Sequence, residues 1–128
     1  MRIKITAIQG GTVLAETKFG QIRGEFHPSS LNFKPCEQKE YEVELSCEET
    51  LTEESVSIST SKKPSIQLDK DMIRITGFVE SVEDCVCFLR LQESLVMFEL
   101  DCNTDWKKII NQNITILISS MHLYDVTP

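Results

Sequence analysis

The chain has 128 residues, of which 41% are hydrophobic and 26% are charged, and its formal net charge is −7 at pH 7. These values are typical of one folded domain with a buried core and exclude an intrinsically disordered chain. The acidic balance also argues against a surface that holds nucleic acid through lysine and arginine.

The N-terminal residues alternate apolar and charged side chains from Arg2 onward, which is typical of a strand and unlike the apolar segment of a secretion signal. Apolar runs elsewhere are far shorter than the roughly 20 residues that span a bilayer. We therefore expect a soluble, cytoplasmic protein without a membrane partner. The five cysteines show no framework spacing, so we expect free thiols in a reducing compartment.

Alternation with period two dominates the chain and predicts mainly antiparallel β-structure. Gly10-Gly11 and Phe19-Gly20 are typical turn sequences, so strands are expected near 2–8, 12–18 and 21–27. Further strands are expected near 41–45, 56–59, 73–75, 85–91, 95–102 and 114–118. The pattern predicts an all-β domain of about eight to ten strands, arranged as a barrel or a sandwich.

One short helix is predicted near 104–111. Asn103 or Thr104 can cap it, Asp105 suits its first turn, and Trp106, Ile109 and Ile110 would share one face. Such a short helix depends on packing through its tryptophan.

The chain also contains a weak internal repeat. Residues 3–7 resemble residues 73–77, and residues 41–46 resemble residues 114–119 at nearly the same offset. A duplication would explain the match, although alternation alone can also produce it. The halves would span 1–60 and 70–128, joined near 61–69 within a single domain, 1–128.

Acidic residues concentrate between positions 37 and 54, where eight glutamates and one lysine give −7, the net charge of the whole chain. Residues two apart on a strand point the same way at a pitch of about 6.6–7 Å, so Glu40, Glu42 and Glu44 would form one carboxylate stripe. The stripe would complement a protein that binds nucleic acid through basic residues. The alternative is a solvated face that prevents strands from pairing edge to edge.

In its size, its acidity and its clusters Glu40-Glu42-Glu44 and Glu48-Glu49, the chain resembles bacterial immunity proteins. These are small cytoplasmic antidotes that bind and neutralise one toxin domain, often a basic nuclease. The resemblance implies that the chain occludes the active site of such a toxin, or a nearby surface. The expected contact residues are Glu40, Glu42, Glu44, Glu48, Glu49, Glu53 and Glu54, together with a second acidic cluster at a hairpin tip, Glu80, Glu83 and Asp84.

The sequence contains no glycine-rich phosphate loop, nucleophile elbow or H-E-x-x-H motif, so we expect neither an enzyme nor a cofactor. Cys85, Cys87 and Cys102, with His27 or His122, could supply four zinc ligands. The C-x-C spacing among apolar residues favours a buried core stripe instead, so no metal site is predicted. Two alternatives to the antidote stay open, an oligomeric β interaction module and a barrel of the oligonucleotide-binding type.

Overall fold

The computed structural model describes residues 1–30 and 33–128. In these ranges the chain forms twelve β-strands and two single-turn 3-10 helices, which confirms the predicted all-β fold class. The count exceeds the expected eight to ten because several strands are very short. Neither described helix has the length or the apolar character needed to cross a membrane.

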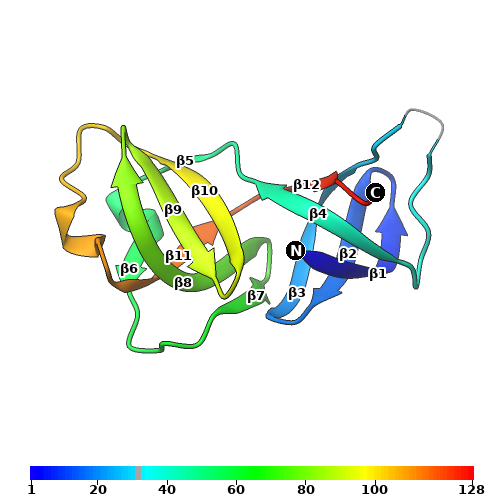
Figure 1. The fold of residues 1–128 in the computed structure, drawn as a ribbon, viewed down its shortest axis with the longest axis horizontal. Coiled ribbons are helices and arrows are strands. Elements are labelled where there is room, and N and C mark those ends of the chain that lie inside the picture. The colour runs from blue at the N-terminus through cyan, green and yellow to red at the C-terminus, as the bar shows by residue number, and fades with distance from the viewer. Residues whose placement is uncertain (31–32) are drawn as a thin grey trace.

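The elements form two separate lobes (Figure 1). The strands are β1 (Arg2–Gln9), β2 (Thr12–Thr17), β3 (Gly20–His27), β4 (Glu40–Ser46), β5 (Thr50–Leu51), β6 (Val56–Ile58), β7 (Ser65–Asp69), β8 (Met72–Glu83), β9 (Val86–Leu91), β10 (Ser94–Leu100), β11 (Asn113–Ile118) and β12 (His122–Asp125). The 3-10 helices are η1 (Glu53–Ser55) and η2 (Lys107–Ile109).

The N-terminal lobe is a closed barrel with the strand order β1-β2-β3-β12-β4. Strands β1 to β3 form the predicted meander, β12 runs parallel to β3, and β4 pairs antiparallel with both β12 and β1. The apolar side chains of the alternating strands fill the barrel. Examples are the buried, inward-pointing Ile3 and Ile5 of β1 and Tyr41 and Val43 of β4.

The second lobe is a sheet with the order β5-β10-β9-β8-β11-β6, and β7 pairs with β8 beside it. Its two ends, β5 and β6, are consecutive in the chain and separated by η1. Strand β5 runs parallel to β10, and β6 runs antiparallel to β11. If β5 and β6 are counted as one interrupted strand, this lobe repeats the strand order of the barrel.

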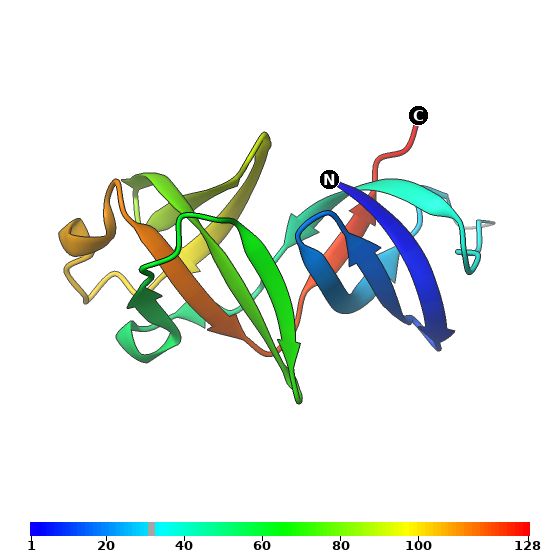
Figure 2. The same cartoon turned by 90° about the horizontal axis from the view of Figure 1, so that it is seen from below.

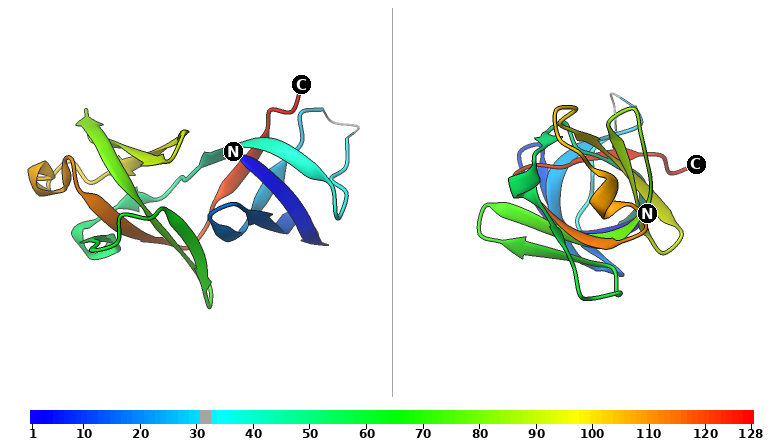
Figure 3. Two further views of the ribbon diagram at one scale, coloured as in Figure 1. Left: turned by 60° about the horizontal axis from the view of Figure 1, so that its bottom comes forward. Right: turned by 90° about the vertical axis from the view of Figure 1, so that its left-hand side faces the viewer.

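Each lobe contains a strand from the other half of the chain. After β4 the chain leaves the barrel and forms β5, η1 and β6 in the second lobe, and after β11 it returns to form β12 in the barrel (Figure 2). The left view of Figure 3 shows these two crossings side by side between the lobes. Neither half has a complete sheet without the other.

The internally similar segments occupy equivalent places in the two lobes. Residues 3–7 lie in β1 and residues 73–77 in β8, and each strand begins a three-stranded meander. The second pair of segments lies in β4 and β11, each of which pairs antiparallel with that first strand. Within the expected joint, 61–69, the chain forms β7.

The lobes meet where the β2–β3 turn packs against β7. The backbone N–H of Ile66 donates to the carbonyl oxygen of Phe19 at 2.9 Å. Gly20 follows Phe19 with φ +133°, and a Cβ atom there would overlap the carbonyl oxygen of Ile66. This close backbone approach therefore requires glycine.

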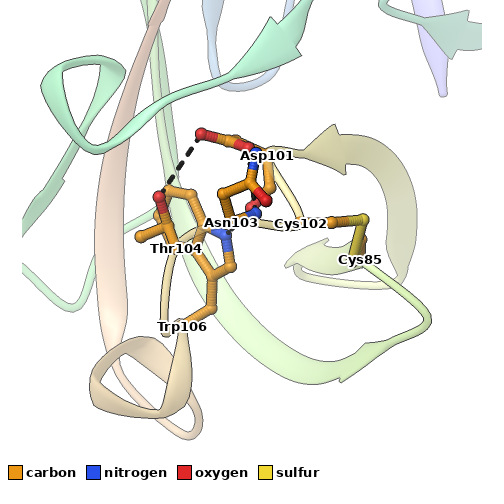
Figure 4. Close-up of a disulfide and its surroundings, with 6 residues drawn as sticks. All are labelled: Cys85, Asp101, Cys102, Asn103, Thr104 and Trp106. Atoms are coloured by element: carbon orange, nitrogen blue, oxygen red, sulfur yellow. Dashed lines mark hydrogen bonds between the residues drawn. A yellow bond between two sulfur atoms is a disulfide. The ribbon is translucent and has the colours of Figure 1, made fainter.

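The predicted helix at 104–111 is wrong in extent, since the structure contains only the single turn η2 among these residues. Asp101 explains the difference (Figure 4). Its side chain accepts hydrogen bonds from the backbone of Asn103 at 3.0 Å and from the hydroxyl of Thr104 at 3.5 Å, and its carbonyl oxygen accepts one from the Trp106 indole at 2.8 Å. These bonds compete with helical backbone bonds over the first turn.

The expectation that all five cysteines are free is also wrong, because Cys85 and Cys102 form a disulfide (Figure 4). Cys85 directly precedes β9 and Cys102 lies just beyond the end of β10, so antiparallel pairing of these strands brings their Cα atoms to 5.4 Å. Among the described residues the other three cysteines are free. Burial raises the pKa of the Cys87 thiol to about 12, which suits its predicted place in the core.

Replacing Cys85 and Cys102 together by serine is expected to lower the free energy of unfolding by about 3 kcal/mol, since the bond closes a loop with a sequence separation of 17. Urea denaturation of the oxidised protein and of the double variant measures the difference. The matched control is Cys36→Ser, which changes an exposed free thiol. Equal stability of the double variant and the wild type would show that the bond does not constrain the unfolded chain.

Candidate protein-binding groove

A groove runs between the two lobes, with β4 of the barrel on one side and the start of β10 on the other. It encloses a cavity of about 380 Å³ that is lined by residues 42–45 of β4 and residues 93–97 around the start of β10. Met1, Glu42, Glu93 and Ser94 also line an adjoining cavity of about 540 Å³. We call the first cavity the β4–β10 groove.

The β4 side of the groove carries the predicted carboxylate stripe. Because Tyr41 and Val43 point into the barrel, Glu40, Glu42 and Glu44 point outward on the opposite face of the strand. Glu42 is half-buried, and its carboxylate lies 3.1 Å from the ammonium group of Met1 and 3.8 Å from the Arg2 guanidinium. Glu40 lies 3.9 Å from the same guanidinium.

Glu44 differs from its two neighbours on the strand. It is exposed and forms no ion pair with any described residue. The cationic groups of Met1 and Arg2 therefore partly neutralise one end of the stripe, and the end that faces the second lobe keeps its negative charge. Of the three stripe carboxylates, Glu44 therefore offers an incoming cation a charge that no described cation neutralises.

The β10 side of the groove carries two large apolar side chains in contact with solvent. Val96 and Phe98 are buried in the second lobe, so Leu95 and Met97 point outward, and these residues are 50% and 58% exposed. Isolated exposed apolar residues are ordinary on protein surfaces. Two of them on one strand, opposite a carboxylate stripe, form the combination of apolar centre and charged rim that is typical of protein interfaces.

Sequence reasoning missed Leu95 and Met97. Residues 95–98 read Leu-Val-Met-Phe, four apolar side chains in a row, so the alternation that identifies the outer face of β4 is absent from β10. The outward direction of Leu95 and Met97 follows from the pairing of β10 with β9, which buries their neighbours.

An ion pair joins the lobes beside the groove, where the groove meets the adjoining cavity. Lys18, in the β2–β3 turn, donates to the carboxylate of Glu93 in the β9–β10 turn at 2.6 Å. This hydrogen bond lowers the pKa of the fully exposed Glu93 carboxyl. It also holds the tip of the β9–β10 hairpin against the barrel, and this contact helps set the width of the groove.

The remaining glutamates of the acidic segment leave the stripe and follow the chain into the second lobe. Glu49 accepts hydrogen bonds from the backbone and the hydroxyl of Ser119, which ties together the two crossings between the lobes. Glu48 lies beside His122, and Glu53, in η1, lies 3.3 Å from the Lys108 ammonium. Glu54 is exposed in the same turn.

The second predicted acidic cluster does not form one group. Glu83 and Asp84 are exposed at the β8–β9 turn, at the other end of β9 from the groove. Glu80 lies within β8 and pairs at 3.2 Å with Arg90, which is opposite Leu95 near the groove end of β9. Figure 1 shows the β8–β9 turn at the end of the second lobe that faces away from the barrel. The ten predicted contact residues therefore fall into separate groups, of which Glu42 and Glu44 line the β4–β10 groove and Glu40 lines the adjoining cavity.

Comparison of the chain with protein-family models, with curated proteins and with solved structures finds no match.

Proposed function

We propose that this chain is a protein-binding antidote that neutralises a basic, nuclease-like bacterial toxin. The β4–β10 groove would receive a basic surface of the toxin at or beside its active site. The observation that carries the proposal is the position of exposed Leu95 and Met97 across one groove from the carboxylates of Glu42 and Glu44.

The two sides of the groove have complementary roles in this proposal. Buried apolar anchors supply most of the affinity in protein complexes, whereas charges around them speed association and exclude partners of the wrong sign. Leu95 and Met97 would insert into the partner, and Glu44 would meet its lysine or arginine side chains. The same carboxylates repel nucleic acid, so the antidote would compete for the toxin without binding the toxin's substrate.

The proposal includes a cytoplasmic site of action, where disulfides are commonly reduced. The Cys85–Cys102 bond lies at the ends of β9 and β10 that are remote from the groove. We therefore expect the reduced protein to keep its binding surface.

Reversing the charge of Glu44 with Glu44→Lys is expected to slow association with the basic partner about tenfold at low ionic strength, because it puts a cation where the partner's cations approach. Stopped-flow or surface-based kinetics over a range of salt concentrations measures the effect. Asp71→Lys, a reversal of equal size in the exposed β7–β8 turn, is the control. Equal slowing by both variants would mean that net charge, and not the groove, steers the encounter.

The direct test begins with the neighbouring genes. The proposal expects an adjacent reading frame that encodes a large secreted protein with a basic, nuclease-like C-terminal domain. That domain, purified and mixed with an equimolar amount of this chain, should lose its nuclease activity. Full activity in the presence of a stoichiometric excess of the chain would contradict the proposal.

The strand order of the barrel favours a second candidate function. Its last strand closes the barrel between the third and the fourth, as in the five-stranded Greek-key barrels that bind oligonucleotides. Titration with fluorescent single-stranded DNA and RNA at low salt distinguishes the two candidates. Tight, salt-sensitive binding would favour this second function, and the acidic surface predicts that such binding is weak.

A further inference from the structure

Both histidines of the chain meet on the barrel surface, at the place where β3 and β12 run parallel. The register pairs His122 with Glu25 and Tyr124 with His27. The Nε2 atom of His27 lies 2.8 Å from the Nδ1 atom of His122, and a carboxylate oxygen of Glu25 lies 3.6 Å from the same Nδ1 atom. One nitrogen from each ring and one oxygen of Glu25 all lie within 4.8 Å of one another.

These three atoms are the ligand types that a zinc-like ion prefers. Imidazole nitrogen suits zinc, copper and nickel, and two histidines with one carboxylate form a common three-residue zinc ligand set. Zn–N bonds of 2.0–2.1 Å at a tetrahedral angle put two histidine nitrogens roughly 3.3 Å apart. The two rings would therefore have to separate by about half an ångström to receive the ion between them.

The surroundings hold both rings in place. The His122 side chain is 15% exposed, and the His27 ring stacks on Tyr124 with ring centroids 4.4 Å apart and an interplanar angle of 12°. The second nitrogen of His122, Nε2, faces the carboxylate of Glu48 at 3.7 Å. A carboxylate that accepts a hydrogen bond from the second ring nitrogen is a common partner of a metal-bound histidine. Such a carboxylate fixes the tautomer and the orientation of the ring.

The nearest basic side chain on this face of β3 is directed elsewhere. The Arg23 guanidinium donates to the carbonyl oxygen of Lys70, at the turn between β7 and β8, with a distance of 3.3 Å. Glu25 is exposed, with a side-chain accessibility of 57%, so its carboxylate is free to turn toward the two rings.

We propose that Glu25, His27 and His122 bind one divalent transition-metal ion of the zinc type, with Glu48 orienting His122. Glu25 and His27 belong to β3, whereas His122 belongs to β12, the strand that returns from the second half of the chain. The bound ion would therefore fasten the exchanged strand to the barrel and stabilise the fold. This site is separate from the function proposed for the β4–β10 groove.

The test uses the full chain with Cys36→Ser and Cys47→Ser, so that these two thiols do not compete for the ion. Calorimetric titration with Zn²⁺ is expected to give one ion per chain at micromolar concentration, and thermal unfolding should shift to higher temperature. Co²⁺ should give the visible absorption of a site with nitrogen and oxygen ligands. Mg²⁺ and Ca²⁺ should produce neither effect, because hard cations prefer oxygen ligands.

Variants of the ligands give the decisive comparison. His27→Gln and His122→Gln are each expected to weaken Zn²⁺ binding at least tenfold and to abolish the thermal shift. Glu25→Gln should also weaken Zn²⁺ binding. Because Glu25 is exposed, this variant keeps the test valid if a histidine variant fails to fold. The matched control is Glu99→Gln, an exposed glutamate of β10 in the second lobe. Zn²⁺ binding that is undetectable in the wild type, or equally tight in the ligand variants, would overturn the proposal and leave a histidine–histidine hydrogen bond.

Discussion

Replacing both apolar residues of the groove, as Leu95→Thr and Met97→Thr together, is expected to weaken binding of the basic partner about 100-fold, or roughly 2.8 kcal/mol. Threonine preserves the β-propensity of the strand and the net charge, so the change removes apolar contact area alone. Both side chains are exposed in the free protein, and the melting temperature should therefore stay within a degree or two of the wild type. Equilibrium titration of each protein with the partner measures the affinity.

The control for this experiment is Ile58→Thr, which removes a side chain of similar exposure from β6 in the second lobe, outside the groove. It should leave the affinity unchanged. If the double groove variant bound as tightly as the wild type, Leu95 and Met97 would not be anchors, and the partner would have to bind another face. Comparing the groove variant, Glu44→Lys and their combination would separate the apolar from the electrostatic contribution to the affinity.

Gly20→Ala is expected to cost about 4 kcal/mol of folding free energy, the largest effect of a single substitution that we predict for this chain. The methyl group would overlap the backbone carbonyl of Ile66, and alanine strongly disfavours the φ of +133° that Gly20 adopts. Relief of the overlap would require β7 to move away from the β2–β3 turn. The hydrogen bond between Ile66 and Phe19 would then be lost. Urea denaturation measures the change.

Gly11→Ala is the matched control for this substitution, because a Cβ atom there meets no described atom within 4 Å. Its stability should lie within about 0.5 kcal/mol of the wild type. Near-equal stability of the two alanine variants would show that the contact between the β2–β3 turn and β7 does not hold the lobes together. A destabilised Gly20→Ala variant that still folds should also have a disturbed β4–β10 groove, since Lys18 in the same turn holds Glu93.

The sequence predicted the elements of this fold better than their arrangement. Alternation and turn residues identified the β1–β3 meander and the acidic strand β4, because both signals are local. The exchange of strands between the lobes depends on pairings such as that of His122 with Glu25, which lie far apart in the chain. Local patterns carry no information about such partners, and the sequence therefore left barrel and sandwich equally open.

The candidate sites show the same division. The carboxylate stripe was predictable because Glu40, Glu42 and Glu44 alternate with apolar residues. The apolar side of the groove was not, since both faces of β10 are apolar in sequence and its pairing with β9 decides which face is exposed. The contact between His27 and His122 could not be predicted from the sequence either, because it depends on β12 lying beside β3.

The most direct test of the groove proposal uses the four methionines as reporters, labelled with ¹³C at the methyl group and followed by NMR as the basic toxin domain is added. Met97 lies in the groove, whereas Met72 lies in β8 next to the β7–β8 turn and Met121 is buried. If the groove binds the toxin, the Met97 signal will shift and broaden at one equivalent while the Met72 signal stays unchanged. A shift of the Met72 signal with an unchanged Met97 signal in the saturated complex would show that the toxin binds outside the groove.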